Sequence, residues 1–411
     1  MSVSPQDCAS TVSVGPSAKT LQTLPNRIKA LTQQALPWNG VKLSKSLHVS
    51  PQALYALLVP EHREYQQQIL NFLGEHPLFK DKHMLDLTLE QQRQLTLEQL
   101  KVISKSPLYR FRDLVDNKLR WAMFMETLYF HGVNIGTKAG VHYGLFGGTV
   151  INIGTPQQYE PLIEAIQNLD IRGCFALTEL GHGSNARDIE TTATWNPEKR
   201  VFLINTPTET AQKMWIGNAG QHGNTAAVFA QLYMNGVNHG VHVFLVTIRT
   251  KDGQPAPGVR VKDCGTKMGL NGVDNGRLWF DNVEVPRESL LSRFGLVDAS
   301  GVYKSQISSP TKRFTAMISS LVGGRMIVSQ GALHICKVAL TIAIRYALSR
   351  RQFGPEGKKE VLLLDYTSHQ RRLFPLLAKV YALQFALNHV KKLWESKVWF
   401  SLFFFKDLGQ S

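Results

Sequence analysis

Cysteine is scarce in this chain, and the cysteines that occur lie far apart. Four are present among 411 residues, and none belongs to a Cys-x-x-Cys pair. Their wide spacing gives no disulfide framework and is typical of a reducing or intracellular compartment. The sequence also lacks a cluster of His, Cys and carboxylate residues at metal-ligand spacing, so we predict no metal site. A continuous apolar run of the kind that marks a secretory signal is absent as well.

Acidic residues are also few, and the shortage leaves a formal net charge of +15 at pH 7. This surplus has two readings: an ordinary solvated basic surface, or attraction for a ligand that carries phosphates. Nucleic acid is not predicted as a partner, because there is no binding module and no dense Lys/Arg run with interleaved aromatics. The first 60 residues contain one acid, Asp7, and many Ser, Thr, Gln and Pro. We predict that residues 1–60 form a flexible N-terminal arm, although a transit peptide has a similar composition.

The period of the hydrophobic pattern changes along the chain. Apolar residues recur at helical spacing over residues 61–170, and short strand patterns separated by turns fill residues 171–300. Helical spacing returns over residues 301–411. The predicted fold class is therefore α+β with several domains: a helical N-terminal domain, a central β domain and a C-terminal helical domain.

Two loops of small residues stand close together in the β-rich part. The first runs from Thr178 to Ser184, and the second runs from Lys213 to Gly220. Between them, residues 191–195 and 201–205 have strand patterns joined by a turn, so a sheet should hold the two loops side by side. Small residues let the backbone approach a flat ligand closely, and Thr, Ser and Asn supply hydrogen bonds. The glycines do not form a Gly-x-Gly-x-x-Gly fingerprint, so a Rossmann fold is not predicted.

These loops resemble the flavin-binding core of the acyl-CoA dehydrogenase and oxidase superfamily. Residues 178–184 look like its Thr-Glu-x-x-x-Gly-Ser element, and residues 213–219 look like its Lys-x-Trp-Ile-x-Asn-Ala element. Residues 350–354 look like its Arg-x-x-Phe-Gly element, and the wider segment is most similar to the peroxisomal acyl-CoA oxidases. The resemblance implies a helical N-terminal domain, a central β-barrel-like domain and a C-terminal helical bundle, of which this chain holds part.

The resemblance also implies FAD as cofactor and assigns roles to single residues. Thr178 is expected to bond the edge of the flavin ring, Trp215 to lie beside the isoalloxazine, and Ser184 to belong to the same set. Arg350 is expected to meet the FAD phosphates, in a neighbouring subunit. Each residue also has a plainer interpretation: a capping Thr in a turn, a core Trp, and a solvated Arg at the end of a helix.

Gly217 separates the oxidases from the dehydrogenases within this resemblance. The dehydrogenases have Thr or Ser at this place, where a hydroxyl can reach the flavin, whereas the oxidases have Gly. The missing side chain is expected to open space near the ring for molecular oxygen. The alternative is that glycine is needed here for backbone geometry.

The catalytic base is not found. The oxidases use a Glu shortly before a Cys-Gly-Gly-His-Gly-Tyr motif, which this sequence lacks, so the expected Glu falls beyond the end of the chain and the catalytic residue stays unknown. Some dehydrogenases carry their base on the helix after the β domain, but no Asp or Glu occurs from Ala299 to Pro355. Because a missing general base typically costs about 10²–10⁴-fold in rate, this C-terminally truncated form is expected to be nearly inactive alone.

The predicted function is that of a FAD-dependent acyl-CoA oxidase, which converts acyl-CoA to trans-2-enoyl-CoA and reduces O2 to H2O2 in peroxisomal fatty-acid β-oxidation. Two alternatives remain: a non-catalytic product that binds acyl-CoA or FAD or pairs with a full-length subunit, and an acyl-CoA dehydrogenase. Apolar faces on residues 327–349 and 361–388 should be partly uncovered, so we predict a homodimer or pairing with a full-length subunit.

The predicted location is the peroxisome. The residues at 408–411 are not a Ser-Lys-Leu-type signal, but Arg27-Ile28 and Gln34-Ala35 loosely fit an N-terminal pattern.

Overall fold

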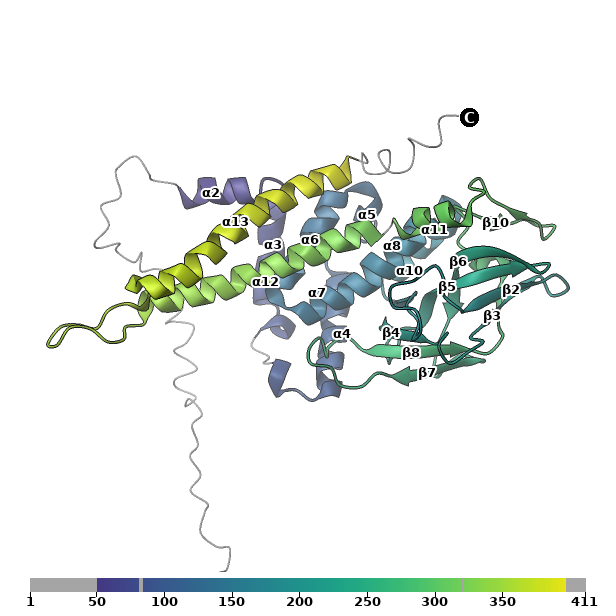
Figure 1. Cartoon of the computed structure of the whole chain (residues 1–411), viewed down its shortest axis with the longest axis horizontal. Helices are drawn as coiled ribbons and strands as arrows, with labels where there is room; N and C mark the ends of the chain where they lie inside the picture. The colour runs from purple at the N-terminus through teal and green to yellow at the C-terminus, as the bar shows by residue number, and fades with distance from the viewer. Residues whose placement is uncertain (1–49, 81–83, 320, 397–411) are drawn as a thin grey trace, which may run out of the picture. The chain divides into compact units, whose positions relative to one another are not determined.

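The computed structural model describes residues 50–80, 84–319 and 321–396 (Figure 1). The N-terminal targeting pattern and the chain end therefore lie outside the described residues, and so does most of the predicted arm. The chain divides into two units, residues 1–54 and 55–411. The helix α2 (Pro51–Leu58) spans the division, and everything that follows concerns the second unit.

Between residues 61 and 167 the elements in the described part of the chain are all helices, as the helical spacing predicts. They begin where side chains can bond the free backbone N–H groups: the Thr88 hydroxyl and the Gln91 side chain form a reciprocal capping box at the start of α4. The longer helices of this part are α3 (Arg63–Glu75), α4 (Leu89–Lys105), α6 (Lys118–His131) and α7 (Val133–Ala139). Shorter ones are η1 (Pro77–Phe79), η2 (Met84–Asp86) and α5 (Asp113–Asp116).

The Gly-rich stretch after α7 is a π-helix, η3 (Gly140–Gly147), which continues directly into α8 (Gly148–Ile153). π-helices are rare and often occur at functional sites. The helical segment that follows, residues 156–167, begins with a capping box at Thr155, but it is broken in three. Because Pro161 has no N–H to donate, a 3₁₀ turn separates its two α-helical pieces: α9 (Pro156–Tyr159), η4 (Glu160–Leu162) and α10 (Ile163–Gln167).

Residues 173–304 form three sheets. The largest has the order β1-β5-β2-β3-β9, and β6 pairs with β5 along its whole length. Its strands are β1 (Gly173–Ala176), β2 (Thr192–Asn196), β3 (Val201–Asn205), β5 (Thr225–Met234), β6 (Val237–Thr247) and β9 (Val283–Pro286). The β5–β6 hairpin turns at Asn235-Gly236, where both residues have positive φ, as the Asn-Gly pair predicts.

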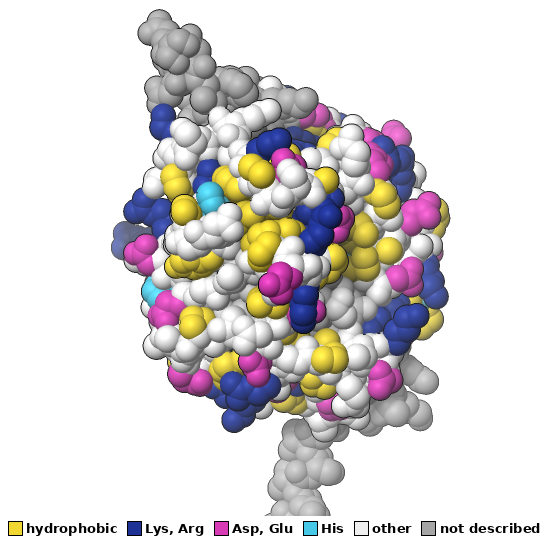
Figure 2. All heavy atoms as spheres, turned by 90° about the vertical axis from the view of Figure 1, so that its right-hand side faces the viewer, with side chains coloured by type: hydrophobic (Ala, Val, Ile, Leu, Met, Phe, Trp, Pro, Cys, Tyr) yellow, Lys and Arg dark blue, Asp and Glu magenta, His cyan; other side chains and the backbone are white. Residues whose placement is uncertain are grey.

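The second sheet carries one of the two loops of interest. It has the order β4-β8-β7, with β4 (Lys213–Gly217), β7 (Val259–Asp263) and β8 (Asn275–Phe280). A small hairpin, β10 (Leu296–Val297) with β11 (Tyr303–Lys304), follows the 3₁₀ turn η5 (Arg287–Ser289). Figure 2 faces this end of the unit and shows hydrophobic side chains among charged side chains of both signs, so the basic surplus forms no single patch on this face.

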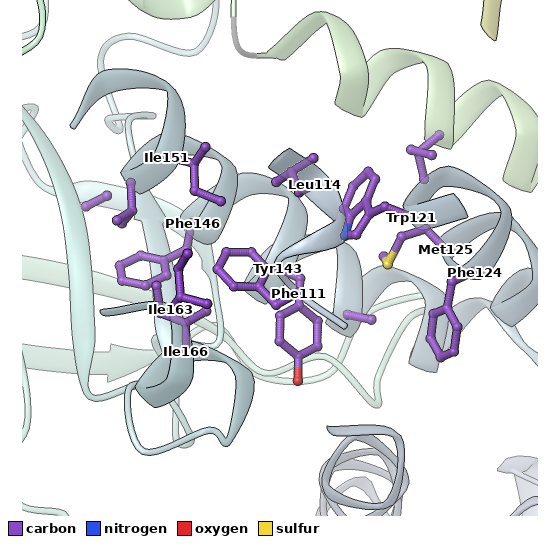
Figure 3. Packing of buried hydrophobic residues seen from close by; sticks show 14 of the residues in the cluster. Phe111, Leu114, Trp121, Phe124, Met125, Tyr143, Phe146, Ile151, Ile163 and Ile166 are labelled. Atoms are coloured by element: carbon purple, nitrogen blue, oxygen red, sulfur yellow. The ribbon is translucent and has the colours of Figure 1, made fainter. Parts of the chain in front are cut away.

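Two apolar cores hold the unit together. The larger joins the helices to one face of the large sheet, with Tyr143, Phe146, Phe111, Ile163 and Ile166 among its buried members (Figure 3). The second lies within the β part, where residues alternate inward along β2 and β3 in the period of a strand. Cys174 is buried in that core, and the cysteines of the described residues, 174, 264 and 336, are all free thiols.

Long helices return after residue 309. They are α11 (Pro310–Ile318), α12 (Leu321–Ser349) and α13 (Thr367–Glu395), with the 3₁₀ turn η6 (Leu363–Asp365) before α13. Figure 1 shows α12 and α13 side by side. Large apolar side chains on both helices are exposed, including Val328, Ile342 and Leu383. By length and composition alone the stretch 310–349 could cross a membrane, but core helices of soluble proteins pass the same test.

Candidate functional site

The two small-residue loops lie side by side, as the sequence predicts. The Met214 amide donates to the Thr178 carbonyl at 2.9 Å, and the Leu180 amide donates to the Gln212 carbonyl at 3.0 Å. An isolated antiparallel bridge joins Glu179 to Lys213. The start of β4 is thereby fixed to the loop that follows β1.

A fully buried ion pair locks this junction. The Lys213 ammonium lies 3.0 Å from Glu179 Oε1, and both side chains have no exposed surface. Lys213 also donates to the Leu177 and Phe229 carbonyls, and Glu179 accepts from the Thr191 amide and hydroxyl. Sequence reasoning placed both residues in the loop motifs but assigned them no role. One signal in the sequence could have indicated the ion pair. Both residues are charged and lie in a β-rich stretch, and buried charges must be paired.

The pKa values of the pair follow from burial and from the partner. Burial lowers the pKa of Lys213 to about 8, although Glu179 acts in the opposite direction. Burial alone would raise the pKa of Glu179, but Lys213 and the donors from Thr191 and Glu190 outweigh it and lower that pKa. Glu179 therefore stays a carboxylate and holds no proton to give.

Trp215 projects from the second loop into solvent. Its side chain is 53% exposed, so it is not the core tryptophan of the plainer interpretation. Its φ of 62° and that of Asn218, 65°, lie in the left-handed region, which non-glycine residues adopt at a cost. The Asn275 side chain donates to the Trp215 carbonyl at 2.9 Å. The loop therefore holds a bare indole in a conformation that its own sequence does not favour.

A second set of buried charges holds the other end of this loop. The Lys138 ammonium donates to Asp274 Oδ1 at 2.8 Å and to Asn218 Oδ1 at 2.9 Å, and it lies 3.0 Å from His222 Nδ1. Both charged side chains are buried. Burial would raise the pKa of Asp274, but Lys138 and His222 outweigh it and hold that pKa well below its usual range. The Arg249 guanidinium completes the set.

Arg249 is buried and reaches two carbonyls at the end of the loop and one just beyond it. Its Nη1 donates to the Gly223 carbonyl at 2.7 Å, and its Nη2 donates to the Ala219 and Gly220 carbonyls at 2.8 and 2.9 Å. These carbonyls cannot bond within a strand, because the chain leaves the sheet here. Arg249 thus supplies the donors that the buried backbone needs.

Gly217 does not border open space. A Cβ placed on it would lie 3.0 Å from both Cγ atoms of Val141, which belongs to η3. The volume that the missing side chain leaves is therefore taken by Val141, and this corrects the expectation that it is open. A side chain at 217 would therefore press on Val141 of η3, and Gly217 as an oxidase marker stays a prediction.

The other predicted site residues fall in different places. Thr178 is half-buried beside the β4 loop, and within the described residues its hydroxyl makes no hydrogen bond. Ser184 is exposed in the same loop. Arg350 is exposed at the end of α12, and Figure 1 shows that end well away from β4. The fold brings together Thr178, Trp215 and Gly217 but not Arg350, so its role in a neighbouring subunit stays a prediction.

No carboxylate in the described part of the chain can be assigned as the base. Glu179 and Asp274 are the carboxylates that the loops enclose, and each is buried and paired with a Lys. The helices α11 and α12 carry no Asp or Glu. The structure therefore supplies a platform for a flat ligand, with fixed loops, a bare indole and a hydroxyl with bonding capacity to spare.

Comparison with known proteins agrees with this geometry. Residues 174–283 match the family model for the acyl-CoA dehydrogenase middle domain, and residues 318–399 match that for the acyl-CoA oxidase C-alpha1 domain. The peroxisomal acyl-coenzyme A oxidase 3 of Arabidopsis thaliana is 46% identical over 313 residues, which are 75% of this chain and 46% of the relative. The chain spans about half the length of the curated relatives it matches.

Solved structures of acyl-CoA oxidases are also similar to this chain. The crystal structure of acyl-CoA oxidase 1 from Yarrowia lipolytica superposes with a TM-score of 0.77 at 33% identity, over 85% of this chain and 50% of that one. Acyl-CoA oxidase-2 of Caenorhabditis elegans, solved with FAD, ascaroside-CoA and ATP, has a TM-score of 0.72 at 32% identity, over 84% of this chain and 52% of that one. The fold is therefore that of the acyl-CoA dehydrogenases and oxidases, which confirms the predicted fold class.

The sequence likeness narrows the class further: the matching relatives are named acyl-coenzyme A oxidases, and the family model that matches residues 318–399 is that of an acyl-CoA oxidase domain. The chain belongs to the acyl-CoA oxidase family and is homologous to its peroxisomal members.

Proposed function

We propose that this protein acts as a FAD-dependent acyl-CoA oxidase. The substrates would be an acyl-CoA and molecular oxygen, and the products trans-2-enoyl-CoA and H2O2. Bound FAD would accept the hydride from Cβ and pass the two electrons to O2, while a base takes the proton from Cα. The family relationship and the FAD in the C. elegans oxidase support this proposal.

One observation in this chain carries the proposal: a strained loop presents the bare indole of Trp215 beside the half-buried Thr178. An aromatic face covers a flat ring system, and a hydroxyl without a partner bonds a ring edge. The residues present therefore fit a flavin. The two buried ion pairs keep the loop in place before the ligand arrives, which lowers the ordering cost of binding.

The chain's residues would divide the work as follows. Trp215 would cover the isoalloxazine and exclude water from one side, and Thr178 and Ser184 would bond the cofactor. Val141 and Gly217 would form the wall between β4 and η3, and Arg350 would reach cofactor phosphates across a subunit boundary. The catalytic base stays unassigned.

We propose further that the protein works in the peroxisome, as the names of its relatives suggest, and that it pairs with itself or with a full-length subunit. The order of helices, strands and helices supports domains at 61–170, 171–300 and 301–411. The N-terminal arm (1–60) stays a prediction, and its residues 51–58 form the helix α2.

FAD titration of the purified chain tests the cofactor proposal. Binding should quench tryptophan fluorescence and raise the melting temperature as FAD is added. Trp215→Leu should remove most of the quench and weaken binding. Trp279→Leu is a matched control, because Trp279 lies on β8 and contacts Glu209 instead of the loop. If the chain shows no FAD binding at high ligand concentration, the proposal is wrong. If FAD binds, a peroxide assay with acyl-CoA separates binding from turnover.

A further inference from the structure

The strand β4 contains a β-bulge at Trp215. On one side of it Lys213 pairs with Leu278 of β8, and on the other Ile216 pairs with Gly276, so two residues of β4 stand opposite one residue of β8. The extra residue breaks the alternation of side chains, and bulges often re-aim a side chain next to a functional site. Here the bulge turns Trp215 outward, although residues 213 and 216 are both buried.

The bulge leaves Trp215 in a left-handed backbone conformation. Its φ is 62°, and for a residue with a side chain such a conformation is disfavoured about fivefold or more relative to ordinary backbone. The sequence around Trp215 does not supply a compensating preference, because tryptophan is not one of the residue types that adopt this region readily. Contacts from other elements must therefore hold the bulge in place.

Asn275 of β8 supplies such contacts on both sides of Ile216. Its backbone pairs with Gly217, and its side-chain Nδ2 donates to the Trp215 carbonyl at 2.9 Å. Its side-chain Oδ1 accepts from the Lys267 ammonium. A half-turn of the amide would set the NH2 group against the ammonium and the oxygen against the carbonyl, so Lys267 fixes which way Asn275 points.

Lys267 is held in turn by the segment 264–274, which joins β7 to β8. Its ammonium also donates to the Val273 carbonyl at 2.6 Å, and its backbone N–H donates to the Asn271 side chain at 2.8 Å. The Asn271 amide donates back to the Lys267 carbonyl at 3.0 Å. Lys267 therefore has little freedom to leave Asn275.

The helical part of the chain anchors this segment near both of its ends. At one end Arg93 of α4 binds Asp263, the last residue of β7, at 2.8 Å. At the other end the Gly272 amide donates to Asn134 of α7 at 3.0 Å, and a Cβ on Gly272 would overlap Thr96 of α4. A chain of contacts made within the described residues thus runs from α4 and α7 through Asn275 to the Trp215 backbone.

We propose that Asn275 is a positioning residue that holds Trp215 in the conformation that covers the flavin, and that Lys267 orients Asn275 for this task. The proposal rests on the proposed function, because Trp215 is the residue that would cover the isoalloxazine. It implies that the apparent dissociation constant for FAD rises in proportion as this conformation becomes less populated. In the plainer alternative, Asn275 stabilises the pairing of β4 with β8 and has no effect on the indole.

Fluorine NMR of the whole chain labelled with 5-fluorotryptophan tests the position of Trp215 without FAD. Trp215→Phe assigns its signal among the seven tryptophans. Asn275→Asp keeps the shape of the side chain and still accepts from Lys267, but it cannot donate to the Trp215 carbonyl. We expect Asn275→Asp to give a second or broadened Trp215 signal. An unchanged signal would overturn the proposal.

Asn238→Asp is the matched control for this substitution. The Asn238 side chain also donates and accepts hydrogen bonds, but it does so on β6, to Gln231, Tyr233 and Gly240. The Trp215 signal of Asn238→Asp should therefore match that of the wild type. An equal change in both variants would mean that the signal reports a general loosening of the β part, which contradicts a specific role for Asn275.

FAD titration of the same proteins connects the position of Trp215 to binding. The dissociation constant should rise about fivefold in Asn275→Asp, which corresponds to one hydrogen bond of ordinary strength. The rise should match the fall in the population of the main Trp215 signal. A lower melting temperature without FAD, together with an unchanged dissociation constant, would establish the plainer alternative. If the wild type binds no FAD, the proposed function is wrong, whereas the fluorine spectra still decide whether Asn275 positions Trp215.

Lys267→Met tests the second step, and it keeps the test decisive if Asn275→Asp does not fold. The Asn275 amide can then turn, so the Trp215 signal should broaden and the dissociation constant for FAD should rise about two- to threefold. In an Asn275→Ala background, adding Lys267→Met should change FAD affinity little, because both residues act through one contact. An unchanged Trp215 signal in Lys267→Met, or an equal loss of affinity in both backgrounds, would contradict the role of Lys267.

Discussion

Two regions of this molecule handle buried positive charge in opposite ways. Around the Trp215 loop, Lys213 and Lys138 are fully buried, and each has a carboxylate within 3.0 Å. Between α12 and α13, Lys337 is half-buried and has an amide oxygen where the other two have an acid. The first region is closed and fixed before any ligand binds. In the second, an amide oxygen takes the place of a carboxylate directly against the ammonium.

Breaking the compensated pair should have the largest effect on stability. Lys213→Met leaves the Glu179 carboxylate buried without its partner, so the free energy of unfolding should fall by about 3–5 kcal/mol. The double variant Lys213→Met/Glu179→Leu should recover a large part of that loss, because an apolar pair has no charge to compensate. Urea unfolding of the three proteins measures this. A loss below about 1 kcal/mol in the single variant would contradict a buried pair.

The closed packing of the same region gives the second prediction. Gly217→Thr should lower the free energy of unfolding by about 1–3 kcal/mol, because its Cβ meets Val141 at 3.0 Å. Adding Val141→Ala should relieve the loss and leave the Thr hydroxyl facing the loop. In a form that turns over, this double variant should also slow reoxidation of the reduced flavin by oxygen. If Val141→Ala does not restore the free energy of unfolding, the contact with Val141 is not what destabilises Gly217→Thr.

Lys337 should have a smaller effect on the free energy of unfolding, and this effect should depend on pH. Its charge should destabilise the fold, whereas Lys213 stabilises it as the partner of Glu179. Its pKa in the folded chain is about 8, against 10.5 without the fold. Between these values the unfolded chain binds more protons, so folding stability rises with pH over that window. Relative to Lys337→Gln, the wild type should gain about 1 kcal/mol from pH 8 to pH 10, after allowing for solvent screening. A flat difference in urea unfolding would mean that the ammonium is compensated after all.

Arg350 should have the smallest effect on stability. Its side chain is exposed at the end of α12, so Arg350→Gln should change the free energy of unfolding by less than about 0.5 kcal/mol. FAD affinity is the sensitive measurement. It should fall only in the associated state, which titration at low and high protein concentration separates. Equal losses at both concentrations would place Arg350 in a site within one subunit.

Local patterns in the sequence were enough to predict the order of helices and strands and the two adjacent loops. Hydrophobic period and small-residue motifs are properties of neighbouring residues, and the Asn235-Gly236 turn and the Thr155 cap are equally local. The two ion pairs are not local, because Lys213 lies 34 residues from Glu179 and Lys138 lies 136 residues from Asp274. No pattern along the chain states which buried Lys meets which acid.

Contacts between elements also explain where the site prediction was wrong. Gly217 suggested empty space, but whether a glycine borders space or a neighbour depends on how closely another helix approaches. Similarly, the helical spacing over residues 61–170 did not indicate that residues 140–147 take the wider π form. The catalytic base could not be placed, because its role depends on where the ligand lies.

The π-helix η3 behaves as an α-helix with an inserted residue. Val141 packs at Gly217 of β4, and Phe146 packs so closely on Gly173 of β1 that a Cβ there would overlap its ring. An α-helix turns about 100° per residue, so removing one residue between these positions would rotate one anchor off its glycine while the other stayed in place. Single-residue deletions should therefore be far less tolerated within 140–147 than in exposed turns such as that at 251–254. The length of this helix is fixed by two strands that it does not pair with.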